Sequence, residues 1–232
     1  MRGGTELSPM RALALTILVA LVASAAFADA PAPPTADPEA RYQALLTAAK
    51  AAAPNVDWGQ LRDAYAARPS FKAFAQSAAK RRMFVAAQAS DCKTALPAAR
   101  AAIEEAYVDA DAHLVAAFCE DAAGDAAAAQ LDRDIGSGLL HSIQTGDGLS
   151  PATAFTPIDV DEEYALMRAL GLKVASQALV QQGGHAYDAL TADNEKGQRA
   201  TYYFLVDRVL AAESAALAPG AVSEGGPPSR TP

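Results

Sequence analysis

An interval of 34 residues restricts the fold of this 232-residue chain more than any other feature of its sequence. The turn-like pairs Ser90-Asp91 and Gly124-Asp125 are separated by that interval. Each pair stands between two segments whose apolar residues follow helical spacing. We expect these helices at roughly 71–89, 92–106, 109–122 and 125–143. Helices joined by such short turns run antiparallel, so the interval predicts paired antiparallel helices.

A helix–turn–helix unit of about 34 residues has the period of the tetratricopeptide repeat. Small residues fall where helices of such a unit approach closely, at Ala95, Ala102, Ala117, Ala129 and Gly136. Met83 departs from this pattern, because a small residue is expected there. Asp37-Pro38 marks the start of an earlier helix, and Trp58 lies on a second one. We therefore expect a tetratricopeptide-like helical region over residues 37–144.

The N-terminus has the features of a secretory signal peptide. Arg11 precedes a mostly apolar run without charges, which ends in the small-x-small triplet A-F-A at Ala28. The run is shorter than the ~20 residues needed to cross a membrane, which argues against an anchor. We expect a signal peptide at 1–28, cleaved after Ala28, and a Pro/Ala linker at 29–36. The mature protein would then be periplasmic or secreted, without a membrane anchor.

The first residues leave the start of translation open. The segment before Met10 carries Glu6, which is unusual in the basic first part of a signal peptide. Met10 is therefore an alternative start to Met1.

The charge of the chain restricts its partners. The formal net charge is −8 at pH 7, and loss of residues 1–28, with two arginines and one glutamate, changes it to −9. Nucleic-acid binding requires a basic face, so this composition excludes nucleic acid as the partner. We expect the partner to be another periplasmic protein or a peptide. Composition does not define the oligomeric state.

The two cysteines are predicted to form a disulfide. Cys92 lies at the start of one expected helix and Cys119 near the end of the next. An antiparallel pair can bring their Cα atoms within the ~4.4–6.8 Å that a disulfide requires. An even number of cysteines in an exported chain favours the same pairing, and two buried thiols are the alternative.

The character of the sequence changes after Ile143. The stretch T-G-D-G-L-S-P-A-T-A-F, beginning at Thr145, contains three turn signals. A short helix follows at 161–170, with Asp159 or Asp161 as its cap and Gly171 after its last turn.

Three antiparallel strands are expected after this helix. The segments K-V-A-S-Q-A-L-V, H-A-Y-D-A-L-T-A and R-A-T-Y-Y-F-L-V-D-R-V are rich in alternating, aromatic or β-branched residues. Gly183-Gly184 and D-N-E-K-G-Q supply the two hairpin connections. The loop, helix and sheet occupy 145–210, and residues 216–232 form a Pro/Gly/Ser tail that we expect to be disordered. The fold class is therefore α+β, with a helical-hairpin layer followed by a small antiparallel sheet.

The order of these segments resembles a family of bacterial exported proteins known as domain of unknown function 4919. The similarity covers about Val56 to Val206, and its most specific part is G-D-G-x-S-P-x-T-A-[FY] followed by a D-E-E-Y-x-x-x-R-A-L-G-L helix. The resemblance supports the architecture and implies no activity, ligand or catalytic residue.

The signature loop is interpreted as a structural turn. Its residues are Gly146, Asp147, Gly148, Ser150 and Pro151. The glycine spacing matches neither phosphate-binding motif and no lysine follows, so a phosphate cradle is excluded. The acidic residues after the loop lack the alternation of a calcium loop. We expect no metal and no cofactor.

Three histidines limit the catalytic hypotheses. His113 follows Asp109 and Asp111, which are expected to cap a helix, and His141 is expected to be partly buried. His185 opens a strand and is the low-ranked catalytic candidate, together with Asp147 and Ser150 of the loop. No nucleophile-elbow motif supports this hydrolase. We therefore expect a non-catalytic interaction module, with the hydrolase as the alternative.

Overall fold

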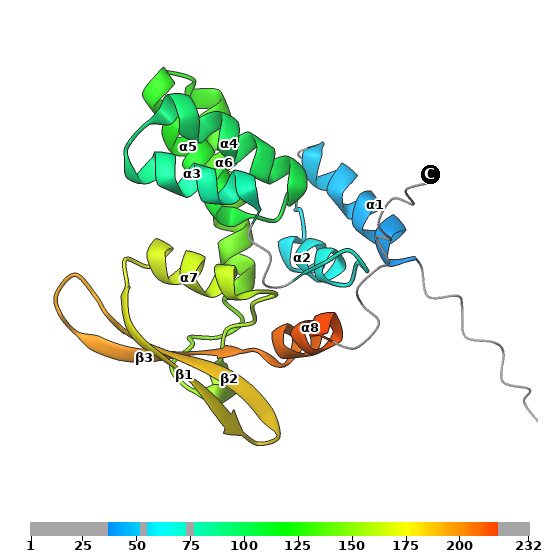
Figure 1. Cartoon of the computed structure of the whole chain (residues 1–232), viewed down its shortest axis with the longest axis vertical. Helices are drawn as coiled ribbons and strands as arrows, with labels where there is room; N and C mark the ends of the chain where they lie inside the picture. The colour runs from blue at the N-terminus through cyan, green and yellow to red at the C-terminus, as the bar shows by residue number, and fades with distance from the viewer. Residues whose placement is uncertain (1–36, 52–54, 73–76, 218–232) are drawn as a thin grey trace, which may run out of the picture. The chain divides into compact units, whose positions relative to one another are not determined.

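The computed structural model describes residues 37–51, 55–72 and 77–217 (Figure 1). The described helices are α1 (Pro38–Lys50), α2 (Trp58–Ala66), α3 (Ala78–Gln88), α4 (Cys92–Glu105), α5 (Ala110–Ala123), α6 (Ala126–Ile143), α7 (Val160–Ala169), α8 (Asp207–Leu217) and the 3₁₀ turn η1 (Pro151–Thr153). The strands are β1 (Lys173–Gln182), β2 (His185–Asp193) and β3 (Arg199–Leu205). The predicted α+β class is confirmed. The predicted signal peptide and linker lie outside the described residues.

Aspartate side chains set the starts of most described helices. In each case the carboxylate accepts a hydrogen bond from a backbone N–H of the first turn, which satisfies a donor that has no partner within the helix. These N-caps are Asp37, Asp57, Asp91, Asp109, Asp125 and Asp159. The predicted cap at Asp109 is thereby confirmed, and of the two candidates for α7 the cap is Asp159.

The 34-residue interval corresponds to two equivalent turns. Ser90 (φ 55°) and Gly124 (φ 84°) both adopt the left-handed conformation that commonly ends a helix. Each is followed at once by the aspartate that caps the next helix, Asp91 or Asp125. The sequence interval therefore marks the two points where helical hairpins reverse direction.

Helix α3 begins later than predicted. Ser77 caps it by accepting a hydrogen bond from Lys80 N at 3.0 Å, so the helix starts at Ala78 instead of Phe71. Phe71 instead follows a turn closed by its N–H to Arg68 O, and its ring packs edge-on against Tyr65.

Close packing of the helices depends on the small residues predicted to lie there. Ala95 and Ala129 are fully buried. A Cβ on Gly136 would lie 2.9 Å from Leu114 Cγ, so α5 and α6 approach so closely here that a larger residue would force Leu114 to move. Met83, the departure from the small-residue pattern, is also fully buried and fills its site.

The predicted disulfide is confirmed. Cys92 at the start of α4 is bonded to Cys119 near the end of α5, with their Cα atoms 5.1 Å apart. The antiparallel order of these two helices accounts for the pairing, as the sequence argument required.

Loss of the disulfide is expected to lower the free energy of unfolding by roughly 3–4 kcal/mol. The bridge closes a loop with a sequence separation of 27, which restricts the unfolded chain. Urea unfolding of the oxidised protein and of the Cys92→Ala/Cys119→Ala variant measures the difference. A difference under about 1 kcal/mol would contradict the entropic account.

The sheet has the order β1-β2-β3 and is antiparallel throughout. Gly183 (φ 62°) and Gly184 (φ 84°) form the first hairpin turn. Both turn positions require the left-handed region, which glycine adopts readily. A bulge interrupts β1 between Val174 and Ser176. The hairpin connections predicted from the sequence are therefore confirmed.

The prediction is wrong for the C-terminal end of the third strand. The strand ends at Leu205, and Asp207 starts α8, a helix that the sequence analysis missed. Asp207 Oδ1 accepts a hydrogen bond from Ala186 N at 2.7 Å, which fixes the first turn of α8 beside β2. The helix extends to Leu217, so the predicted tail begins two residues too early; residues 218–232 lie outside the described part.

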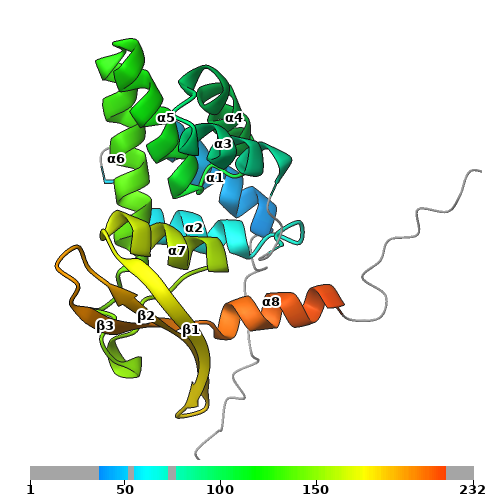
Figure 2. The ribbon, with the colours of Figure 1, turned by 60° about the vertical axis from the view of Figure 1, so that its left-hand side comes forward.

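Helix α7 lies between the helical hairpins and the sheet (Figure 2). Leu166 and Met167 on α7, Leu139 on α6 and Leu190 on β2 are all buried in one hydrophobic core. The helical and β parts thus share a core. In the described part of the chain, no helix combines the length and apolar character needed to cross a membrane.

Candidate functional site

The polar side chains of α7 connect elements that are distant in sequence. The helix contains the D-E-E-Y-x-x-x-R motif, and three acidic residues stand in its first turn, where the helix dipole favours negative charge. These acids contact different neighbours because successive positions on a helix point in different directions.

Glu162 forms a buried ion pair with Arg62 of α2. Arg62 Nε donates to Glu162 Oε1 at 2.7 Å, and its Nη2 donates to Glu162 Oε2, so the pair is bidentate. Arg62 also donates to Thr156 O at 2.9 Å, and Ile158 N donates to Glu162 Oε2 at 2.8 Å. Both side chains are at least nine-tenths buried. This network fixes α2, the loop before α7 and α7 itself relative to each other.

Two further ion pairs connect α7 to α3 and α5. Lys80 Nζ lies 2.9 Å from Asp109 Oδ2 and 3.1 Å from Asp161 Oδ2. Burial opposes the charge on Lys80, but the carboxylates of Asp109 and Asp161 outweigh it and raise the pKa of the amine. Near the other end of α7, Arg168 donates to Asp111 Oδ2 at 2.6 Å.

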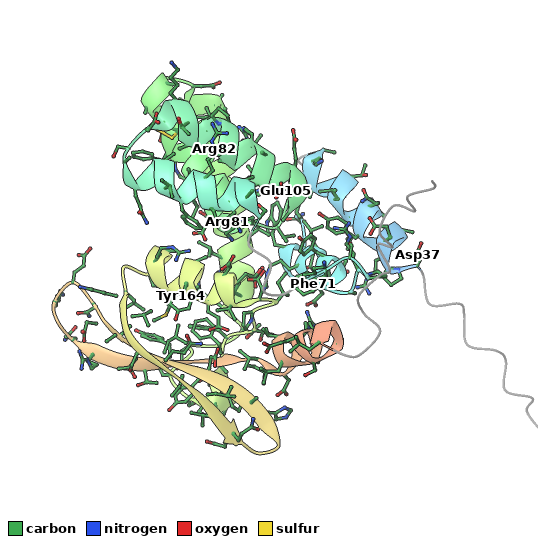
Figure 3. The ribbon with its side chains drawn as sticks, viewed as in Figure 1. Asp37, Phe71, Arg81, Arg82, Glu105 and Tyr164 are labelled. Carbon is green, nitrogen blue, oxygen red and sulfur yellow. A yellow bond between two sulfur atoms is a disulfide. The ribbon has the colours of Figure 1, made fainter. Side chains whose placement is uncertain are left out.

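A pocket with a cavity volume of about 230 Å³ opens beside these ion pairs. Tyr65 and Phe71 form part of its apolar wall, while Glu105 lies at the end of α4 (Figure 3). The acidic side chains that line the pocket outnumber the basic ones; the acids are Glu105, Asp109, Asp111, Asp159, Asp161 and Glu162, and the bases are Lys72 and Lys80. Four of these acids are paired with cations, and the carboxylate of Glu105, which is unpaired among the described residues, disfavours an anionic ligand.

Asp159 is an acid of this pocket whose pKa is strongly raised. Burial is the main cause, and the neighbouring Glu162 carboxylate adds to it; together they raise the pKa of Asp159 to about 8. Its carboxyl also caps α7 by accepting from Glu162 N at 2.9 Å. A perturbed acid in a pocket is a candidate functional group, although the cap gives Asp159 a structural role as well.

The signature loop runs along the outer edge of β3. Tyr203 N donates to Gly148 O at 2.7 Å, and Phe155 N donates to Tyr203 O at 2.9 Å. Leu205 N then donates to Phe155 O at 2.8 Å. The loop therefore satisfies backbone groups of a strand edge that would otherwise be open.

Asp147 and Ser150 come together within this loop, on Thr153. Asp147 Oδ1 accepts from Thr153 Oγ1 at 2.6 Å and from Leu149 N at 3.0 Å, and these bonds lower the pKa of Asp147. Ser150 Oγ lies 2.9 Å from the same Thr153 hydroxyl. Pro151 begins η1 directly after Ser150. These contacts stabilise the loop conformation.

His185 is paired elsewhere. Its Nδ1 lies 2.5 Å from Asp207 Oδ2, at the start of α8, and both side chains are exposed. The structure records no contact between His185 and Asp147 or Ser150 among the described residues. Asp188, on the same strand, accepts a hydrogen bond from Gln177 of β1.

The other two histidines have different surroundings. His141 is exposed, so the prediction that it is partly buried is wrong; it lies on the solvent side of the last turn of α6. His113 is buried, with Nδ1 2.6 Å from Asp132 Oδ1 and Nε2 3.0 Å from Tyr107 O. It supports the packing of α5 on α6.

Sequence reasoning singled out the α7 motif and missed its partners. Arg62 and Glu162 are 100 residues apart, and no local pattern connects them. Lys80 begins a run of three basic residues, a pattern typical of a solvated helix face, so the sequence does not indicate that its side chain is buried. Its partner Asp109 was recognised as a cap, but a cap gives no sign of an ion pair to another helix.

The described residues contain no group of three or more His, Cys, Asp or Glu side chains placed to hold a metal ion. A family model described as "Domain of unknown function (DUF4919)" matches residues 41–215. Comparisons with curated proteins and with solved structures found no match. The matched range includes the signature loop, α7 and the whole sheet. The chain therefore belongs to the family described as domain of unknown function 4919.

Proposed function

We propose that this chain is an exported, non-catalytic interaction protein that takes a side chain of a partner protein or peptide into the pocket beside α7. The observation that carries the proposal is the size and lining of that pocket. Its volume of about 230 Å³ lies below the ~300–1,000 Å³ of typical small-molecule and cofactor sites. A single large side chain of a partner fits this volume better than a metabolite does.

The lining suggests the chemistry of the partner residue. Tyr65 and Phe71 offer aromatic surface, and aromatic-walled pockets are typical sites for the anchor residues of an interface. Glu105 has no bonded partner among the described side chains and lies exposed at the rim. These features favour a side chain with an apolar stem and a positive end, such as lysine or arginine.

The hydrolase alternative has less support. Asp147 and Ser150 both bond Thr153 within the signature loop, whereas His185 bonds Asp207, so in the described part of the chain the candidate base makes no bond to the candidate nucleophile. A nucleophile and its base need to lie within hydrogen-bond reach of each other.

Charge reversal at the pocket rim tests the proposal. We expect Glu105→Lys to weaken capture of the partner at least ~10-fold, because it places a cation where the proposal puts the partner's positive end. A photo-crosslinking residue at position 71 first captures the partner in the periplasm, and the crosslinked chain is identified. Peptides of that partner are then titrated against the protein and against the variant to measure the affinity.

The matched control is Glu104→Lys, which makes the same change on the same helix at an exposed position outside the pocket. Equal loss of crosslinking in both variants would point to net charge alone. Unchanged capture in Glu105→Lys would rule out the pocket as the docking site.

A further inference from the structure

Glu163 has an environment unlike that of the other acids on α7. Its side chain is fully buried. Neither carboxyl oxygen meets a hydrogen-bond donor in the described part of the chain. A buried carboxylate without donors or a counter-charge is strongly destabilising, so the group is expected to hold a proton.

Asp188 of β2 is the acid that acts most strongly on Glu163. Asp188 is itself buried, and its Oδ2 accepts from Gln177 Nε2 of β1 at 2.6 Å. Gln177 Oε1 in turn accepts from Tyr164 of α7 at 2.6 Å. A chain of hydrogen bonds thus fixes the Asp188 carboxyl on the face of the sheet that meets α7, and Figure 3 shows Tyr164 on this side of the helix.

No described cation is bonded to this acid pair. Three cations on or near α7 are bonded to other acids: Arg62 to Glu162, Lys80 to Asp109 and Asp161, and Arg168 to Asp111. Asp159 and Glu162 add like charge. Burial first, and then the Asp188 carboxylate, raise the pKa of Glu163 to about 9, and burial also raises the pKa of Asp188.

We propose that Glu163 and Asp188 form a proton-dependent latch that holds the β1–β2 hairpin against α7. While one proton lies between the two carboxyls, Glu163 donates to Asp188 and the contact is stable. When that proton leaves to water, two like charges face each other in a buried interface and the hairpin separates from α7. This property is independent of the proposed pocket, so either can fail without the other.

The direction of the pH dependence follows from the raised pKa. Between the ordinary carboxyl value of 4.5 and about 9, the folded protein holds a proton on Glu163 that the unfolded chain has released. The stabilisation is complete below that window and is lost as the pH rises through it. The unfolding constant therefore increases about tenfold per pH unit for this proton. Asp159 contributes in the same direction up to about pH 8.

The experiment compares urea unfolding of the whole mature protein and of Glu163→Gln from pH 5 to 9. We expect the slope of the logarithm of the unfolding constant against pH to be smaller by about one in the variant, which is a tenfold difference for each pH unit. The reason is that a glutamine amide donates to Asp188 without titrating. Hydrogen exchange, corrected for intrinsic pH effects, is expected to show β1, β2 and α7 losing protection with rising pH before α4–α6. This local loss is expected to be absent from the variant.

Two further variants keep the test decisive. Asp188→Asn removes the like charge and serves if Glu163→Gln does not fold; a partial flattening of the pH dependence is expected, because burial alone still raises the pKa of Glu163. Glu104→Gln, at an exposed acid outside the pocket, is expected to keep the wild-type profile. An unchanged pH slope in the folded Glu163→Gln or Asp188→Asn protein, or uniform loss of protection across all helices and strands, would overturn the latch.

Discussion

Replacing Gly148 with alanine is expected to lower the free energy of unfolding by ~2–5 kcal/mol, through two additive effects. Gly148 has φ +71°, where a side chain introduces backbone strain. A Cβ there would also lie 2.4 Å from Cε2 of the Phe155 ring. Phe155 is buried and belongs to the common core, so its ring has little room to move. Urea unfolding at constant pH measures the loss.

The control for this prediction is Gly184→Ala. Gly184 also has a positive φ, of 84°, but no atom lies within 4 Å of a Cβ placed there. Its substitution therefore reports backbone strain alone, on the order of 1 kcal/mol. If Gly148→Ala and Gly184→Ala destabilise equally, the contact with Phe155 has no energetic role and the loop is more adaptable than its geometry indicates.

Replacing Arg62 with methionine is expected to destabilise the protein by ~3–5 kcal/mol, because it leaves the buried Glu162 carboxylate without its counter-charge. The bond to Thr156 O is lost at the same time. Thermal and urea unfolding of the variant provide the measurement. The double variant Arg62→Met/Glu162→Leu is expected to recover much of the loss, since two apolar side chains can replace a buried ion pair.

A surface ion pair supplies the comparison. Arg208 of α8 pairs with Asp63 of α2, and both side chains are about half exposed. Arg208→Ala is expected to change stability by less than ~1 kcal/mol, because water screens such pairs. A similar loss in Arg62→Met and Arg208→Ala would show that burial does not set the energy of these pairs.

The sequence predicted those parts of the fold that depend on local signals. The left-handed Ser90 and Gly124, the caps after them, the hairpin glycines and the Cys92–Cys119 pairing all follow from neighbouring residues or from the order of adjacent helices. The predicted start of α3 was wrong because the sequence offers two serines of equal capping ability, Ser70 directly before the expected start and Ser77 seven residues later. In the structure Phe71 packs against Tyr65 before the helix begins, and Ser77 is the cap.

The candidate site could be predicted only in part, for the same reason. The α7 motif and the loop stand out in the sequence, but what each side chain contacts depends on the three-dimensional fold. Glu162 and Glu163 are adjacent and chemically identical, yet one binds a buried arginine and the other faces a buried aspartate. Helical geometry predicts that the two side chains point in different directions, but it does not predict which residues each of them contacts.

The ion pair between α2 and α7 also bears on how the chain can be divided. The composition changes at residue 144, which suggests a natural place to cut the protein into a helical and a β fragment. A fragment that ends there would retain Arg62 without Glu162 or Thr156, its partners beyond that point. The N-terminal helices would then keep a buried guanidinium that lacks its carboxylate. During synthesis, Arg62 therefore stays without its carboxylate partner until Glu162, 100 residues later in the chain, has left the ribosome.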